Sequence, residues 1–257
     1  IQPGRNGIIS QQQLVDAIKK DTILVSIMAA NNEIGVLQPI DKIAMICKQK
    51  NITFHSDAAQ AFGQISLEPN TTGIDLLSIS SHKIYGPKGI GALIIGKKVP
   101  IMPLQWGGRQ EQGLRAGTLP VPLIIGMGKA AEIAMQEMIQ RKERLTYLRN
   151  KLWDELKKAL PELILNGCLN TRLSNNLNFT IPGVNGKKLH QKLKGFLNCS
   201  SGSACNMGEV SHVLIALGHN YEEAEASLRL SLGKETSEQE ITTVIPLLIK
   251  SILELKS

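Results

Sequence analysis

A lysine stands directly after a run of residues typical of a buried strand. The segment Ser80-Ser81-His82-Lys83 continues through a tyrosine into a turn rich in Gly and Pro (SSHKIYGPKG). A lysine held among small residues at a strand end can be removed from water, which lowers its pKa and makes the neutral amine a nucleophile. Ser80 and His82 beside it could bind an anion such as phosphate. An ordinary surface lysine in a turn remains the alternative.

Two further polar clusters also follow apolar runs. Asp57 lies in HSDAAQ after the run ITF, and Asn32 lies in NNEIG after TILVSIM. A carboxylate at a strand end could pair with a protonated heterocyclic nitrogen of a cofactor, and the amides could grip a carboxylate. The alternatives are a helix N-cap for Asp57 and an Asn-Gly turn for Asn32.

The four cysteines differ in their surroundings. Cys205 lies in SSGSAC, among small residues, which indicates an accessible loop and a reactive thiol. The alternative for Cys205 is a small buried side chain. Cys47 and Cys199 have apolar neighbours and are expected in the core, whereas Cys168 stays undecided. The irregular spacing matches neither a disulfide framework nor a zinc site.

The Gly-rich segment 107–118 precedes a long helical stretch. Its backbone N–H groups could bind an anion, or the segment could form a subunit contact. It lacks the strand context of a dinucleotide-binding fingerprint and the GK[ST] ending of a P-loop, so nucleotide binding is not expected.

Alternating strands and helices must position these clusters in the first half of the chain. Because strand, helix and strand follow at short spacing, we predict an α/β fold with a mainly parallel sheet covered by helices. The clusters then lie at the carboxyl ends of strands, where α/β proteins bind ligands. The expected helices cover 11–20 and a segment that opens at Pro39, and the expected strands cover 22–28, 52–56, 76–80 and 91–95. The apolar stripe of the second helix is expected to consist of Ile40, Ile43, Ala44 and Cys47.

The second half has an α+β pattern. Residues 121–159 are strongly helical with one expected break, and we place a domain boundary inside this stretch, giving domains 1–138 and 139–257. The expected strands lie near 162–165, 175–181 and 228–232, and the expected helices near 186–194, 209–217 and 236–255.

Composition bounds the kind of protein. Of the 257 residues 42% are hydrophobic, and the formal net charge of +7 comes from 29 basic and 22 acidic residues that are scattered along the chain. The chain has no basic patch with interleaved aromatic residues, so nucleic-acid binding is not predicted. No apolar run is long enough for a membrane span, and no secretory or transit peptide is evident, which indicates a cytoplasmic setting. The chain opens on Ile1 within a turn-like sequence, so we expect a fragment.

Six motifs in this order resemble the pyridoxal-phosphate-dependent cysteine desulfurases of the class V aminotransferase group. They are NNEIG, HSDAAQ, SSHKIYGPKG, EQGLRAGTLP, SSGSAC and SLRLSLG. The resemblance implies the fold type I architecture, with helices on both faces of the sheet and a smaller C-terminal domain that carries the reactive cysteine. It also implies that the N-terminal part of that fold is missing.

The resemblance also assigns a cofactor site for pyridoxal 5'-phosphate. It implies that Lys83 bonds covalently to the cofactor, that Asp57 pairs with the pyridinium nitrogen, and that Gln60 bonds to the phenolic oxygen. The phosphate would be bound by Ser80, by His82 and, from the other subunit of a homodimer, by Thr118.

For the substrate, the resemblance implies L-cysteine, whose carboxylate Asn32 and Arg229 would hold. The planar fork of arginine suits this task because it pairs with two oxygens. Cys205 would attack the substrate sulfur, leaving a persulfide and alanine. The expected sulfur acceptors are iron–sulfur scaffold proteins or tRNA-thiolation sulfur carriers.

Several features depart from the family pattern. Arg109 stands where Gly is usual, Ser56 where Val is common, and Val210 where Pro is frequent, and the Cys205 loop is about two residues shorter than usual. The alternatives are a selenocysteine lyase, another class V aminotransferase with no use for Cys205, an inactive remnant, or an RNA-binding protein.

Overall fold

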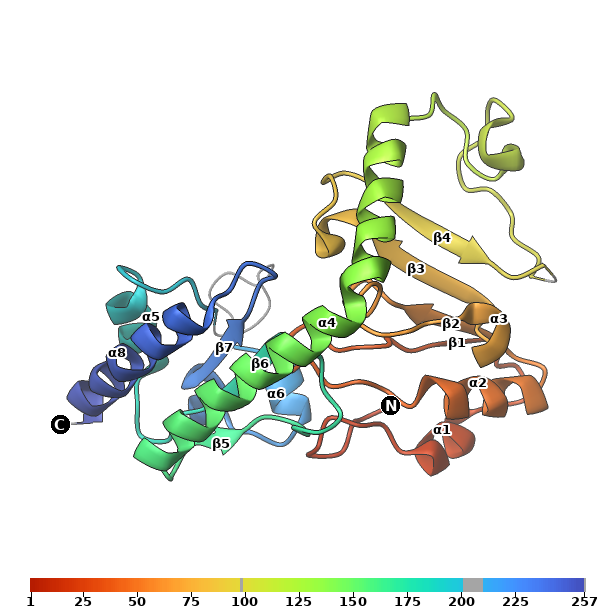
Figure 1. The fold of residues 1–257 in the computed structure, drawn as a ribbon. Helices are drawn as coiled ribbons and strands as arrows, with labels where there is room; N and C mark the ends of the chain where they lie inside the picture. Colours follow the sequence, from red (N-terminus) through yellow and green to blue (C-terminus); the bar gives the residue numbers. More distant parts are fainter. Residues whose placement is uncertain (98, 201–209, 257) are drawn as a thin grey trace. The chain divides into compact units, whose positions relative to one another are not determined.

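A computed structural model describes residues 1–97, 99–200 and 210–256, which form two compact units (Figure 1). Unit 1 comprises Ile1–Ile18, Ala30–Gln38 and Ile139–Ser257. Unit 2 comprises Lys19–Ala29 and Pro39–Met138. None of the helices in the described ranges is long and apolar enough to cross a membrane. Within the same ranges, no group of three or more His, Cys, Asp or Glu residues is arranged to hold a metal ion.

Unit 2 is built on a four-stranded sheet in the order β1-β2-β3-β4. The first three strands run parallel and β4 pairs antiparallel with β3. The predicted α/β class with a mainly parallel sheet is therefore confirmed. Its elements are β1 (Leu24–Ser26), α2 (Ile40–Gln49), β2 (Thr53–Asp57), α3 (Pro69–Thr72), β3 (Leu76–Ser80), η1 (Ser81–Ile84), β4 (Gly91–Ile95), η2 (Gln110–Gly113) and the first half of α4 (Val121–Ala159).

Helix α2 shows why the sequence folds this way locally. Its apolar residues recur at helical spacing, and the four that form the predicted stripe, Ile40, Ile43, Ala44 and Cys47, are all buried. The helix packs against β2, whose second residue, Phe54, is fully buried. This packing fixes β2 and thereby the position at which β2 ends.

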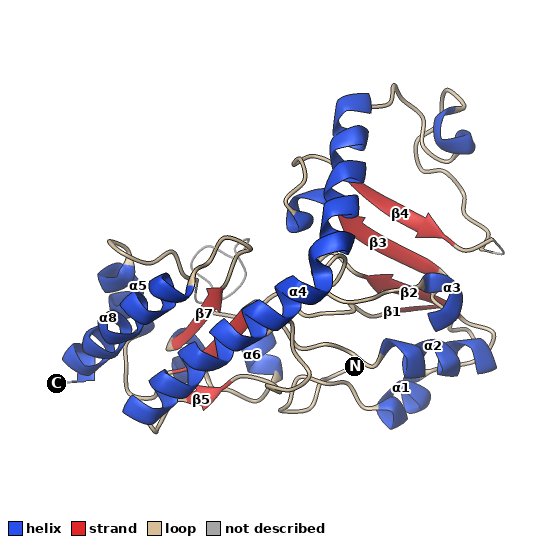
Figure 2. Ribbon diagram, in the orientation of Figure 1, coloured by secondary structure: helices blue, strands red, loops and turns tan. Residues whose placement is uncertain are grey.

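Unit 1 is built on an antiparallel sheet in the order β5-β6-β7 (Figure 2). Its largest apolar cluster joins α4, α5 and α8 to this sheet and includes Trp153, whose ring centroid lies 5.9 Å from that of Phe179. Its elements are α1 (Gln11–Ala17), the second half of α4, β5 (Ile164–Leu165), β6 (Asn176–Thr180), α5 (Gly186–Leu193), α6 (His212–Ala216), α7 (Tyr221–Glu225), β7 (Ser227–Ser231) and α8 (Glu238–Lys256).

Residues 30–38 belong to unit 1, although they stand between two strands of unit 2 in the sequence. The amide N–H of Leu37 donates to the carbonyl of Thr171 over 3.0 Å, and the Gln38 side chain donates to the carbonyl of Gly7 over 2.7 Å. These long-range bonds join the segment to the N-terminal and C-terminal parts of unit 1. The assignment of domains to 1–138 and 139–257 stays a prediction.

Helix α4 differs from the expectation of a break. It is a single hydrogen-bonded helix of 39 residues. The reason is its composition, because no Gly or Pro occurs between Gly128 and the helix end. Helix α6 starts at His212, later than expected, because the Ser211 side chain accepts from the N–H of Leu214 and caps the helix there.

Candidate functional site

The carboxyl ends of β2 and β3 carry the first group of predicted site residues. Asp57 is the last residue of β2 and Ser80 is the last of β3, and both strands run in the same direction. The Ala58 N–H donates to the Ser78 carbonyl over 2.8 Å, which holds the two strand ends together. The exposed carboxylate of Asp57 accepts from the Ala59 N–H over 2.8 Å, so its position is fixed while it still faces solvent.

Lys83 follows in the short helix η1, which begins where β3 ends. A single turn of this kind buries residues three apart, here Ser81 and Ile84, and turns the residues between them outward. His82 and Lys83 are therefore exposed. Of the two environments considered for Lys83, the structure shows the exposed lysine in a turn and not a side chain removed from water. The Ser80 hydroxyl and the His82 Nδ1 lie 2.9 Å apart, so these two predicted phosphate ligands form one pair.

His55 is a site feature that sequence reasoning did not single out. Its Nδ1 lies 2.8 Å from the Ser26 hydroxyl on β1, and its Nε2 lies 2.8 Å from the Ser78 hydroxyl on β3. One imidazole thus bridges three parallel strands on one face, close to the end that carries Asp57. The signal available in the sequence was a polar residue within a strand otherwise suited to burial.

Two other predicted cofactor ligands, Gln60 and Thr118, are not fully buried. Gln60 is half-buried in the turn that follows β2, and Thr118 is exposed ahead of α4. The predicted role of Thr118 concerns another subunit. Arg109 is also exposed, and it precedes a turn in which Glu111 and Gln112 have left-handed φ angles of 48° and 58°.

Unit 1 brings together the two residues predicted to hold the substrate carboxylate. Arg229 lies on β7, and its Nη1 donates to the backbone carbonyl of Asn32 over 3.2 Å. Its backbone is fixed by the ladder pairing with Asn178 on β6 and by a bridge to Ser200. Burial lowers the pKa of the half-buried Arg229 guanidinium, and the negative charge of Glu33 opposes that shift.

Cys205 lies outside the described residues, and the three described cysteines are free thiols. Cys47 is fully buried, as predicted, and burial, with a smaller effect of Asp75, raises its pKa to about 11. Cys199 is only partly buried at the edge of the unit 1 core, and burial raises its pKa to about 11. The backbone N–H of Thr171 is the main group that lowers the pKa of the undecided Cys168.

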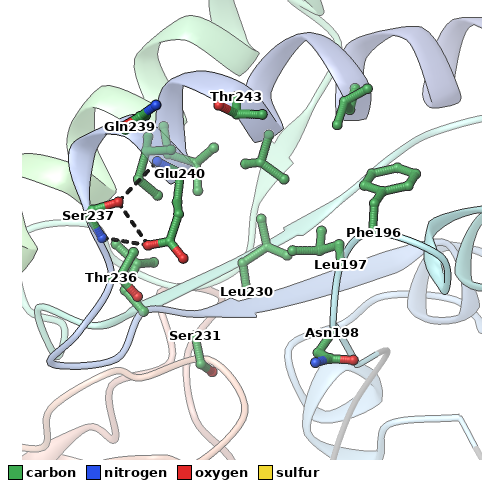
Figure 3. Close-up of a pocket in the computed structure, with 15 residues that line it drawn as sticks. Phe196, Leu197, Asn198, Leu230, Ser231, Thr236, Ser237, Gln239, Glu240 and Thr243 are labelled. Atoms are coloured by element: carbon green, nitrogen blue, oxygen red, sulfur yellow. Dashed lines mark hydrogen bonds between the residues drawn. The ribbon is translucent and has the colours of Figure 1, made fainter.

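A mainly apolar pocket of about 540 Å³ lies in unit 1 beside the start of α8 (Figure 3). Phe196 and Leu230 line it, and its polar rim is the N-terminal cap of α8, where Glu240 accepts from the N–H and hydroxyl of Ser237 over 2.7 and 2.9 Å. None of the predicted site residues in the described ranges lines this pocket. It is therefore distinct from both clusters above.

The two other departures from the family pattern have clear environments. Ser56 is fully buried on β2, and its hydroxyl has no hydrogen-bond partner within the described part of the chain. Val210 packs against a small apolar cluster that contains Ile34 and Leu214. A valine at position 56 would leave no unpaired hydroxyl, and the surroundings of Val210 are apolar, which agrees with a valine or proline being usual at these positions.

Comparisons with known proteins give matches along nearly the whole chain. The family described as Aminotransferase class-V matches residues 1–244. The cysteine desulfurase IscS of Rickettsia rickettsii is 46% identical over 256 residues, which cover 98% of this chain and 62% of that protein. The chain thus spans less than two thirds of the length of such curated relatives.

Solved structures also match most of the chain. A NifS-like protein superposes with a TM-score of 0.90 at 35% identity, covering 99% of this chain and 68% of that one. A structure described as SspA in complex with cysteine superposes with a TM-score of 0.73 at 36% identity, covering 92% of this chain and 66% of the other.

Proposed function

Because this chain belongs to the class V aminotransferase family, we propose that it is part of a cysteine desulfurase, which converts L-cysteine to L-alanine and retains the sulfur as a persulfide on Cys205. The observation that carries the proposal is that Asp57 ends one strand and Lys83 follows the parallel strand beside it. The similarity to a structure described as containing cysteine supports the choice of substrate.

The residues at these strand ends fit pyridoxal 5'-phosphate. The exposed amine of Lys83 suits its aldehyde, the fixed carboxylate of Asp57 suits its protonated ring nitrogen, and the Ser80–His82 pair suits its phosphate. Gln60, in the turn after β2, is proposed to bond to the phenolic oxygen. When bound, the cofactor supplies an electron sink for negative charge at the substrate Cα.

Residues of the chain itself then bind the substrate, transfer the proton and attack the sulfur. The guanidinium of Arg229 and the amide of Asn32 bind the substrate carboxylate, and the Lys83 amine moves the Cα proton. The thiolate of Cys205 attacks the substrate sulfur, so that an S–S bond forms and the substrate C–S bond breaks. The electron pair of that bond stays on the carbon fragment, which takes up a proton and leaves as alanine.

We also propose a cytoplasmic homodimer that passes sulfur to an iron–sulfur scaffold or a tRNA-thiolation carrier. The segment before Thr118 supports the dimer, because Met102, Leu104 and Trp106 are 79%, 96% and 79% exposed. Apolar side chains gathered on a surface mark an interaction site. Such a contact would let Thr118 reach the phosphate bound by the other subunit.

The test is alanine release from L-cysteine by this chain with added pyridoxal 5'-phosphate. We expect alanine from the unaltered chain, and loss of more than nine tenths of it in Lys83→Ala and in Cys205→Ala. Activity retained in Cys205→Ala would favour an ordinary class V aminotransferase. Absence of alanine from the unaltered chain would contradict activity of this chain by itself.

A further inference from the structure

Glu33 is a buried carboxylate that the proposed reaction does not use. It is only 1% exposed and stands between Asn32 and Ile34, within the segment 30–38 of unit 1. A carboxylate withdrawn from water is retained only where other groups satisfy it. Its partners therefore indicate what it does.

Three side chains hold Glu33 in place. The Ser211 hydroxyl donates to the Glu33 Oε2, and the same hydroxyl accepts from the Leu214 N–H over 3.1 Å at the start of α6. The backbone carbonyl of Glu33 accepts from the side-chain amides of Asn176 over 3.1 Å and Asn178 over 3.0 Å. Glu33 thus ties its own turn to α6 on one side and to β6 on the other.

The same turn carries Asn32, one of the two residues proposed to bind the substrate carboxylate. Asn32 precedes Glu33, and its carbonyl accepts the hydrogen bond from Arg229 Nη1 over 3.2 Å. Asn178, which donates to Glu33, lies opposite Arg229 in the β6–β7 ladder. The charge of Glu33 also acts on Arg229, since it opposes the lowering of the pKa of the guanidinium by burial.

The turn has little freedom to adjust if Glu33 is lost. Gly35 has a φ of +70°, and a Cβ added there would lie 2.6 Å from the Asn176 side chain. The backbone of the turn therefore packs directly onto the start of β6. In addition to this packing, Glu33 contributes hydrogen bonds and a negative charge to the turn.

We propose that Glu33 is a positioning residue that fixes Asn32 and balances and orients the Arg229 guanidinium, so that the pair is set to receive a substrate carboxylate. This inference rests on the proposed function, because recognition of the carboxylate of L-cysteine is part of it. The residue does not touch the reacting sulfur.

Three variants of the full chain separate charge from hydrogen bonding. Glu33→Gln keeps an acceptor for the Ser211 hydroxyl and removes the charge. Ser211→Ala keeps the charge and removes the hydrogen bond. Glu240→Gln is the matched control, because Glu240 is also a carboxylate that accepts from a serine hydroxyl, and it lies at the start of α8.

Two measurements decide the proposal. The first is KM and kcat for alanine release, where we expect Glu33→Gln to raise KM about tenfold with kcat changed less than twofold. The second is the guanidinium NMR signal of Arg229, assigned by its loss in Arg229→Lys. It should shift in Glu33→Gln, shift less in Ser211→Ala and stay in place in Glu240→Gln.

An unshifted Arg229 signal in Glu33→Gln would overturn the proposal, as would a KM equal to that of Glu240→Gln. A loss of kcat with unchanged KM would equally overturn it, since that pattern points to a role in the chemical step or in folding. If the unaltered chain released no alanine, the proposed function of the isolated chain would fail. The NMR comparison would still decide the role of Glu33.

Discussion

Two asparagines on β6 donate to the same carbonyl, yet we expect their removal to have different costs. Asn178 is fully buried, its Nδ2 donates to the Glu33 carbonyl over 3.0 Å, and its Oδ1 accepts from Asn166 over 2.8 Å. Asn176 also donates to the Glu33 carbonyl, over 3.1 Å, but its buried Oδ1 has no partner within the described residues. The two positions therefore differ by one satisfied hydrogen bond.

The magnitudes follow from these contacts. Asn176→Ala removes one hydrogen bond from a carbonyl that keeps a second donor, and it also removes an unpaired oxygen, so we expect a loss of about 1 kcal/mol. Asn178→Ala removes two bonds and leaves the Asn166 amide with only a 3.4 Å contact to Ser227. A buried donor left nearly unpaired adds about 1–3 kcal/mol, so we expect a total of about 3 kcal/mol.

The assay is urea unfolding of unit 1, followed by the fluorescence of Trp153, which packs against Phe179 of β6. The sequence has two tryptophans, so the measurement is made with Trp106→Phe in every variant to remove the exposed one. The midpoint should fall more in Asn178→Ala than in Asn176→Ala, at an equal slope. Equal midpoints, or a larger fall of the midpoint in Asn176→Ala, would refute the costs assigned to these hydrogen bonds.

Three further outcomes are expected. Gly35→Ala should destabilise unit 1 by about 3 kcal/mol, because it combines a left-handed φ with a Cβ 2.6 Å from a neighbouring side chain, and thermal unfolding measures this. Alkylation at pH 8, resolved by peptide mass spectrometry, should modify Cys168 before Cys47, whose pKa is about 11; the reverse order would contradict the assigned environments. A hydrogen bond from Lys151 is the main cause that lowers the pKa of Glu238 below 4.5, so its stabilising contribution is present above pH 4.5 and is lost as the pH falls. The stability difference between the unaltered chain and Glu238→Gln should accordingly shrink as the pH falls below 4.5, and a difference that stayed constant on acidification would exclude the ion pair as its source.

The elements with a clear period were predictable from the sequence. The strands at 76–80 and 91–95 have the expected bounds, and the apolar stripe of α2 is buried as expected. In α2 the local pattern and the final burial agree, because the helix buries one face against β2. Strand 91–95 has the expected bounds although most of its residues are exposed. The order of strands and helices was then sufficient to predict a mainly parallel sheet.

The features that were not predictable depend on long-range contacts. NNEIG reads as a turn, and nothing in its local pattern shows that Glu33 is bonded by Asn178, which is 145 residues away. The exposure of Lys83 depends on the phase of a single short turn, η1, and this phase is decided by the burial of Ser81 and Ile84. In NNEIG and in the turn that carries Lys83, the residue types indicated which groups could bind a ligand. Tertiary packing decided which of these side chains face inward.

The predicted site residues divide between the two units according to their chemistry. Lys83 and Asp57, proposed to bind the cofactor, lie in unit 2, and Asn32 and Arg229, proposed to bind the substrate carboxylate, lie in unit 1. Each unit can therefore be perturbed by itself. Lys83→Ala should abolish the visible absorbance of the bound cofactor, whereas Arg229→Lys should leave that absorbance unchanged and raise KM for L-cysteine about tenfold, because lysine cannot form the two-pronged contact. If Arg229→Lys weakened cofactor binding as much as it raised KM, the assignment of Arg229 to the substrate would be wrong.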